Sequence, residues 1–116
     1  MLFIWYPRCS TCQKALKYLN ELGFEPSLRD IVLENPTKDE LSSYLKLAKI
    51  DINKAFNTSG LVYKAMDLKN KMADLTIDEK LTLLATNGKL VKRPIIVTAD
   101  KVIFGFKPEQ YDALKK

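Results

Sequence analysis

Cys9 and Cys12 are the residues whose type and spacing point most directly to chemistry. They are the two cysteines of this sequence and lie three positions apart, in the motif Cys9-Ser10-Thr11-Cys12. At the start of a helix, unpaired backbone N–H groups and the helix dipole favour negative charge. We therefore expect the pKa of Cys9 to fall and its thiolate to act as a nucleophile. Cys12, at i+3, can then resolve a mixed disulfide formed at Cys9.

Two alternative interpretations of the motif are a pair of ordinary buried residues and half of a zinc site. Two cysteines are too few for a disulfide scaffold, and a structural zinc site usually needs four ligands. The sequence contains no histidine, which removes histidine metal ligands and histidine general bases. The position of the motif between an apolar strand and a helix favours a redox dithiol, and we expect no metal site.

Arg93-Pro94 is the second feature that could carry chemistry. Arginine is a permanently charged planar fork, suited to an oxyanion or a thiolate, although a solvated surface arginine is the alternative that spacing alone favours. A proline at the start of a strand beside the dithiol loop could be cis, but only about 5–6 % of such bonds are.

Other residues could add to a site around the dithiol. Scattered cations that could supply positive potential are Arg8, Lys14, Lys64, Lys92 and Lys107, each of which could equally be a surface residue. Residues 57–60 (Asn-Thr-Ser-Gly) suit a helix cap better than an anion-binding nest, though both use the same N–H groups. The aromatic residues Trp5, Tyr6 and Phe104 fit a core better than a binding platform.

The first third of the chain has the pattern of a β-α-β unit. Residues 2–6 are an apolar run bounded by Pro7, which predicts a buried strand. A helix follows from Ser10, where Ser10 and Gln13 fit a capping box, and Gly23 should stop it. Residues 24–33 predict a second strand, with residues 31–33 at its end.

The remainder predicts several helices and then two strands. Capping boxes at Thr37–Glu40 and Thr76–Glu79 predict two helices, the second ending at Gly88, and a short helix is expected at 62–68 between them. Residues 94–98 and 102–104 predict an antiparallel pair, and 108–114 a closing helix.

This order of elements predicts an α/β fold. A four-stranded mixed sheet would be flanked by helices, with a helical insertion at about 36–88 between the βαβ and ββα halves. A length of 116 residues fits one domain spanning 1–116.

Composition narrows the class of protein further. Apolar residues make up 47 %, enough for a packed core, and no apolar run approaches the roughly 20 residues that span a bilayer. We therefore expect a cytoplasmic protein, monomeric and with no membrane partner. The net charge of +5 is scattered, which favours an anionic substrate or an acidic protein partner over direct nucleic-acid binding.

Five stretches of the sequence, in this order, resemble the ArsC/Spx-like family of thioredoxin-fold proteins (arsenate reductase-like, Spx/MgsR). They are residues 6–15, 34–41, 56–64, 90–97 and 102–108, so the resemblance covers essentially the whole chain. It implies a thioredoxin-like sheet with a helical insertion and a cis bond before Pro94. It also implies Cys9 as the redox nucleophile and Arg93 as the residue facing it.

The resemblance implies two competing functions. Arsenate reductases of this type use one catalytic cysteine, with glutathione and glutaredoxin, and three arginines that hold the oxyanion. Arg93 matches one of those arginines, whereas the other two positions fall on Asn57 and Lys107. Spx-type regulators carry C-x-x-C as a redox switch and bind the C-terminal domain of the RNA polymerase α subunit.

We therefore predict a thiol–disulfide redox protein. Cys9 is the nucleophile, Cys12 the resolving or switch cysteine, and Arg93 stabilises negative charge. The residues expected to contact substrate are Ser10, Thr11, Asn57, Lys64, Pro94 and Lys107. No bound cofactor is expected, and the partner is a thiol or disulfide: glutathione, glutaredoxin or thioredoxin as reductant. The alternatives are a redox-sensing regulator that binds the RNA polymerase α subunit, and an arsenate reductase.

Overall fold

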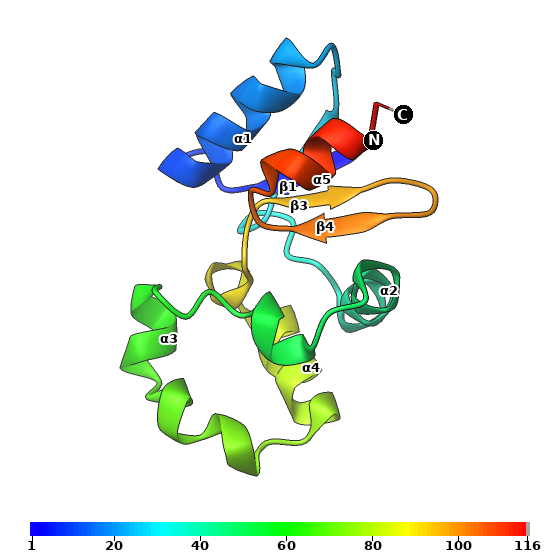
Figure 1. The fold of residues 1–116 in the computed structure, drawn as a ribbon. Helices are drawn as coiled ribbons and strands as arrows, with labels where there is room; N and C mark the ends of the chain where they lie inside the picture. The colour runs from blue at the N-terminus through cyan, green and yellow to red at the C-terminus, as the bar shows by residue number, and fades with distance from the viewer. Residues whose placement is uncertain (116) are drawn as a thin grey trace.

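A four-stranded sheet forms the centre of the protein (Figure 1), as seen in a computed structural model that describes residues 1–115. Its strands are β1 (Leu2–Trp5), β2 (Ser27–Asp30), β3 (Ile95–Val97) and β4 (Val102–Phe104). The spatial order is β2-β1-β3-β4, with β1 and β2 parallel and the other two pairs antiparallel. The sheet is therefore mixed, which confirms the fold class predicted from the order of elements.

Helices cover both faces of this sheet. The helices on one face are α1 (Ser10–Glu21) and α5 (Pro108–Ala113). Those between β2 and β3 are α2 (Lys38–Ala48), α3 (Leu61–Ala65) and α4 (Ile77–Thr86). Short 3₁₀ turns join these helices, namely η1 (Ile52–Ala55), η2 (Leu68–Asn70) and η3 (Met72–Asp74), and η4 (Gly88–Leu90) leads from α4 to β3. This is the predicted helical insertion, and it lies on the other side of the sheet (Figure 1).

The alternation of side chains along the strands explains why both faces are covered. Successive residues of a strand point to opposite faces. Phe3 packs with Leu19 of α1 and Tyr111 of α5, whereas Ile4 packs in the larger core of the insertion with residues such as Leu41. Both Phe3 and Ile4 are completely buried. Because both faces of β1 are apolar, each has to be covered. Within residues 1–115, no helix combines the length and the apolar character that crossing a membrane would take.

Two of the three predicted capping boxes are present and start α2 and α4. Thr37 accepts a hydrogen bond from the Glu40 N–H at 3.1 Å, and the Glu40 carboxylate accepts one from the Thr37 N–H at 2.9 Å. Thr76 and Glu79 repeat the arrangement on α4, at 3.1 and 3.0 Å. Each box satisfies two backbone donors that the first helical turn leaves without partners.

The third predicted capping box, between Ser10 and Gln13, is wrong. The Cys9 N–H donates to the Tyr6 carbonyl at 2.9 Å, and this turn leaves Cys9 extended (φ −85°, ψ 120°) immediately before the helix. Cys9 therefore takes the N-cap position and Ser10 is the first helical residue. The Gln13 amide instead donates to the Pro7 carbonyl at 2.7 Å.

Several predicted element ends also differ from the structure. Residues 31–33 form a turn and not the end of a strand, because the Asp30 carboxylate accepts the N–H groups of Val32 and Leu33 at 2.8 and 3.0 Å. The short helix predicted at 62–68 ends at Ala65, since Asp67 has a left-handed backbone with φ 52°.

Gly88 is not the helix stop that the sequence predicted. Its role is in packing. α4 already ends at Thr86, and Gly88 begins the η4 turn. A Cβ atom at Gly88 would lie 1.9 Å from the Ile31 carbonyl oxygen, closer than any side chain tolerates. The missing side chain thus lets η4 pack against the turn that follows β2. This contact sets the position of the segment 90–93 that follows.

Arg29 fastens the insertion to the sheet. Its guanidinium makes two hydrogen bonds to the Glu40 carboxylate, at 2.7 and 2.9 Å, and also donates to the carbonyls of Glu34 and Asn35. Paired N–H donors facing both oxygens of a carboxylate form a strong, directional contact. One arginine on β2 therefore orders the connecting turn and the start of α2 together.

Replacing Glu40 by glutamine should destabilise the fold at neutral pH. The amide can keep the capping geometry, but it loses the ion pair. The Arg29 guanidinium lowers the pKa of Glu40 from 4.5 to about 2. The Glu40 side chain is 34 % exposed, so solvent screens the pair, and we expect a loss of about 1–2 kcal/mol in the free energy of unfolding at pH 7. This stabilisation is complete above pH 4.5 and disappears as the pH falls towards 2, where the two proteins should converge.

Urea denaturation between pH 2 and pH 7 measures this effect, and α4 offers a matched control. Glu79 makes the same capping box, but neither of the ion pairs found within residues 1–115 includes it. Glu79→Gln should therefore change the free energy of unfolding much less than Glu40→Gln. Equal effects of the two substitutions would contradict a special role for the Arg29 pair.

Candidate functional site

Cys9 stands at the amino end of α1, in the N-cap position. The first turn of α1 contains no acidic residue, so nothing in that turn offsets the positive end of the helix dipole. The residue is half-buried, which leaves its thiol accessible from one side. Cys9 thus combines exposure to a reagent with an environment that favours a negative sulfur.

Cys12 lies in the first turn behind Cys9 and has no solvent exposure, at 0 %. Both cysteines are free thiols, and the Cys12 thiol is close enough to help lower the pKa of Cys9. An external molecule can therefore meet the sulfur of Cys9, whereas the sulfur of Cys12 is reached through Cys9.

The surroundings shift the pKa values of the two thiols in opposite directions. Burial alone raises the pKa of Cys9, but the Cys12 N–H, the Cys12 thiol and the Arg93 guanidinium outweigh it and hold that pKa below its ordinary value. Burial raises the pKa of Cys12 to about 12, and the adjacent Cys9 sulfur adds to the shift. Cys9 is therefore the sulfur that becomes a thiolate, and Cys12 keeps its proton at neutral pH.

A short stretch of backbone pairing brings Arg93 to Cys9. The Lys92 N–H donates to the Ala55 carbonyl at 2.7 Å, and the Asn57 N–H donates to the Leu90 carbonyl at 2.8 Å. Residues 55–57 and 90–92 thereby run side by side, and the chain enters β3 through Arg93-Pro94, whose peptide bond is cis. The insertion and the sheet are joined at this point, directly opposite the amino end of α1.

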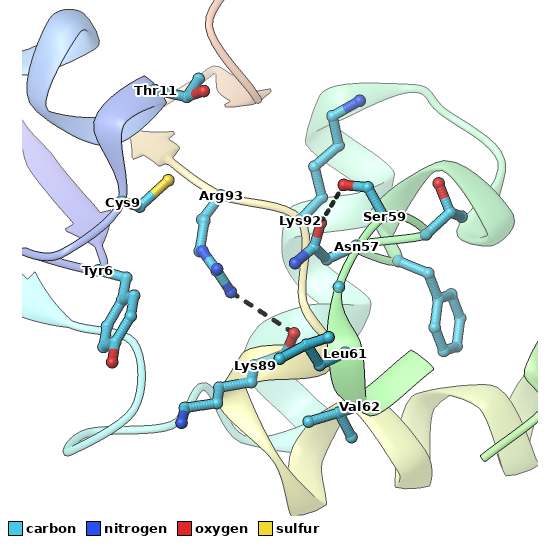
Figure 2. Close-up of a pocket in the computed structure, with 13 residues that line it drawn as sticks. Tyr6, Cys9, Thr11, Asn57, Ser59, Leu61, Val62, Lys89, Lys92 and Arg93 are labelled. Carbon is cyan, nitrogen blue, oxygen red and sulfur yellow. Dashed lines mark hydrogen bonds between the residues drawn. The ribbon is translucent and has the colours of Figure 1, made fainter. Parts of the chain in front are cut away.

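Between these elements lies an open cleft of about 740 Å³. Figure 2 shows Cys9 and Thr11 on one wall, Asn57 and Ser59 on the opposite wall, and Arg93 between them. The Arg93 guanidinium donates to the Lys89 carbonyl at 3.5 Å and lies 5.1 Å from the centre of the Tyr6 ring. The remaining lining residues come from positions 56–62 and from Lys89 and Lys92.

The structure brings together only part of the residue set that the sequence predicted. Cys9, Thr11, Asn57 and Arg93 line the cleft. Cys12 is buried behind Cys9 and Pro94 is buried beneath the wall. Three other predicted residues are exposed and outside the lining: Ser10, Lys64 and Lys107.

Sequence reasoning missed Lys89 and assigned Tyr6 to the core alone. Tyr6 does pack against the larger core, but its ring also lines the cleft. The Lys89 ammonium lies 5.9 Å from the centre of this ring, which Arg93 also contacts. Leu61 and Val62 complete the cleft, whereas the sequence predicted only that Val62 begins a short helix and assigned Leu61 no role. No local signal distinguishes these residues, because their meeting depends on the pairing between 55–57 and 90–92.

Arg93→Gln should raise the pKa of Cys9, because the guanidinium favours the thiolate over the thiol. We expect the rate of iodoacetamide alkylation at Cys9 to follow the thiolate fraction, with a midpoint below the ordinary cysteine pKa in the wild type. In Arg93→Gln the midpoint should move up, and alkylation at pH 7 should slow several-fold. Mass spectrometry of the alkylated peptide assigns the site, and Cys12 should stay unmodified in the folded protein.

Lys64→Gln is the matched control, since it removes a positive charge outside the cleft. Its alkylation profile should coincide with that of the wild type. If Arg93→Gln behaved as Lys64→Gln does, Arg93 would have no influence on the Cys9 sulfur.

Comparison with known proteins agrees with this arrangement. The ArsC family model matches residues 4–114. The Bacillus subtilis (strain 168) protein YusI is 42 % identical over 112 residues, covering 97 % of this chain and 95 % of YusI. The regulatory protein MgsR from the same organism is 31 % identical over 116 residues, covering 100 % of this chain and 90 % of MgsR.

A solved structure extends the likeness to three dimensions. The crystal structure of an ArsC family related protein from Bacteroides fragilis matches with a TM-score of 0.95 and 51 % identity, covering 97 % of this chain and 95 % of that protein. The family match at residues 4–114 includes the dithiol, Arg93 and every residue that lines the cleft. The chain therefore belongs to the ArsC family.

Proposed function

We propose that this chain is a thiol–disulfide redox protein, with Cys9 as nucleophile and Cys12 as resolving cysteine. The observation that carries the proposal is the contrast between two adjacent sulfurs. Cys9 is accessible and has a lowered pKa, whereas Cys12 is 0 % exposed and has a pKa raised to about 12. Such a contrast assigns one sulfur to attack and the other to resolution.

In the first step the Cys9 thiolate attacks one sulfur of a substrate disulfide. The substrate S–S bond breaks, a bond forms between Cys9 and the attacked sulfur, and the other substrate sulfur leaves as a thiolate that takes a proton from solvent. Arg93 balances the negative charge on the Cys9 sulfur before attack.

In the second step Cys12 loses its proton and attacks the Cys9 sulfur of the mixed disulfide. The second substrate thiol leaves and a Cys9–Cys12 disulfide forms, so that two electrons have passed to the substrate. The charge on Cys9 is one cause of the high pKa of Cys12, and it vanishes when the mixed disulfide forms. Two external thiols, from two glutathione molecules or from one glutaredoxin or thioredoxin dithiol, then return two electrons and two protons to the protein and leave as a disulfide.

Cysteine variants test this sequence of steps with a peptide disulfide as substrate. Reduced wild type should release two thiols per chain and end with an internal disulfide, seen by mass spectrometry as the loss of two hydrogen atoms. Cys12→Ser should stop at a stable mixed disulfide on Cys9, because no second sulfur is available to release it. Cys9→Ser should release no thiol, since Cys12 is buried.

Thr11→Ala serves as the control for substitution at the same helix start, since it leaves both sulfurs in place. It should still form the internal disulfide. An accumulation of mixed disulfide on Cys12, or thiol release by Cys9→Ser, would contradict the assigned roles.

A redox-sensing regulator is the second candidate, and the name of one relative favours it. MgsR, a regulatory protein, aligns over 100 % of this chain. In this alternative, oxidation of Cys9 and Cys12 changes a surface that binds the RNA polymerase α subunit. A binding assay with the α C-terminal domain, using reduced and oxidised protein, tests it. Absence of binding in both states would remove this candidate.

Arsenate reduction has less support from the cleft. Among the described residues that line it, Arg93 supplies the one guanidinium, while Asn57 is neutral and Lys107 lies outside. An assay with arsenate, glutathione and glutaredoxin should therefore give little turnover compared with the peptide disulfide.

A further inference from the structure

The cleft is lined by two lysines in addition to Arg93, the cation that acts on the Cys9 sulfur. Lys89, Lys92 and Arg93 line it, and none of the described lining residues is acidic. None of these three cations belongs to an ion pair within residues 1–115. Lys89 and Lys92 therefore form no ion pair with a carboxylate of residues 1–115.

Lys89 is held on one side of Arg93. Its ammonium lies 5.9 Å from the centre of the Tyr6 ring, and Arg93 lies 5.1 Å from the same centre. An aromatic face attracts cations and limits the positions that they adopt. The Arg93 hydrogen bond to the Lys89 carbonyl also ties the two residues together, at 3.5 Å. Lys89 thus presents its charge at a defined edge of the cleft, beside Tyr6 (Figure 2).

Lys92 lies on the other side of Arg93, where Gly105 leaves room for its stem. A Cβ atom at Gly105 would lie 3.0 Å from Cε of Lys92, so the lysine stem crosses the space that a side chain would fill. Gly105 has φ +88°, a backbone conformation that favours glycine. In Figure 2 the Lys92 ammonium points away from Arg93 and from Lys89. The two lysines therefore extend in opposite directions on the two sides of Arg93 (Figure 2).

The rim beside these charges is apolar. Leu61, the first residue of α3, is 85 % exposed and lines the cleft together with Val62. Charges on two sides and an apolar rim suit a peptide-like chain, whose carboxylates reach the lysines while its methylene groups lie on Leu61.

We propose that Lys89 and Lys92 are specificity-determining residues that select disulfides flanked by carboxylates. This inference rests on the proposed thiol–disulfide function and names its substrate class: a peptide disulfide with negative charge on both sides of the sulfur. The carboxylates can come from the main-chain ends of a small peptide, as in oxidised glutathione, or from acidic side chains of a longer one. Both sources offer the same chemistry to the lysines.

Single-turnover reduction by the reduced protein tests the proposal with three probes. Two are symmetric peptide disulfides with blocked termini, one with glutamate and one with glutamine on both sides of the cysteine. The third is oxidised glutathione. The readout is the ratio of second-order rate constants for the glutamate and glutamine peptides. We expect wild type to favour the glutamate peptide, and each of Lys89→Gln and Lys92→Gln to lower the ratio about two- to fivefold.

Lys101→Gln is the matched control, because it removes one positive charge from the exposed turn between β3 and β4. It should leave the ratio unchanged, which separates local contacts from the net charge of the protein. The ratio of rate constants for the glutamate and glutamine peptides should also fall in wild type when the salt is raised from 0.05 to 0.5 M, because salt screens exposed charges.

The outcomes separate this inference from the function on which it rests. If wild type reduces both peptides at the same rate, and the lysine variants reduce oxidised glutathione as fast as wild type does, the redox function stands and the selection by lysines is wrong. The same conclusion follows if Lys101→Gln lowers the ratio as much as Lys89→Gln and Lys92→Gln do. If neither peptide nor oxidised glutathione is reduced, both proposals are overturned. Rapid reduction of oxidised glutathione, lost in the lysine variants, would identify main-chain carboxylates as the source.

Discussion

The amino end of α1 and the guanidinium of Arg93 act on one sulfur atom, and the chemistry proposed for the protein depends on their meeting there. The helix supplies unpaired N–H groups within a few residues of Cys9, whereas Arg93 comes from a segment more than 80 positions away. Together they outweigh the burial that would otherwise raise the pKa of Cys9. Cys12, one turn further and out of solvent, receives little of this benefit and keeps its proton.

The position of Arg93 is set by contacts that have no chemical role of their own. Residues 55–57 pair with residues 90–92, and Gly88 lets the preceding turn lie against the carbonyl of Ile31. Arg29 anchors the other end of the insertion through Glu40. The insertion is therefore held to the sheet at both of its ends. One wall of the cleft belongs to it and the other to α1, so the cleft exists only when both are in place.

Much of the fold could be predicted because its signals are local. Each signal depends on residues a few positions apart: the apolar runs at residues 2–5 and 95–97, and the capping boxes at Thr37 and Thr76. The errors also have local causes that the pattern did not reveal. Asp30 turns the chain after β2 by accepting two backbone N–H groups, and the turn from Tyr6 to Cys9 moves the cap from Ser10 to Cys9.

The sequence by itself determined that a dithiol begins the first helix, since motif, strand and helix are contiguous, and it indicated Arg93 through a family resemblance. Only the tertiary structure decided which cations line the cleft. It includes Lys89 and leaves out Lys64 and Lys107, although nothing in the residues around these lysines distinguishes them. The physical reason is that the residues next to a charged side chain in the sequence do not indicate which way that side chain points. Its place follows from long-range backbone pairing and from the space that Gly105 leaves open.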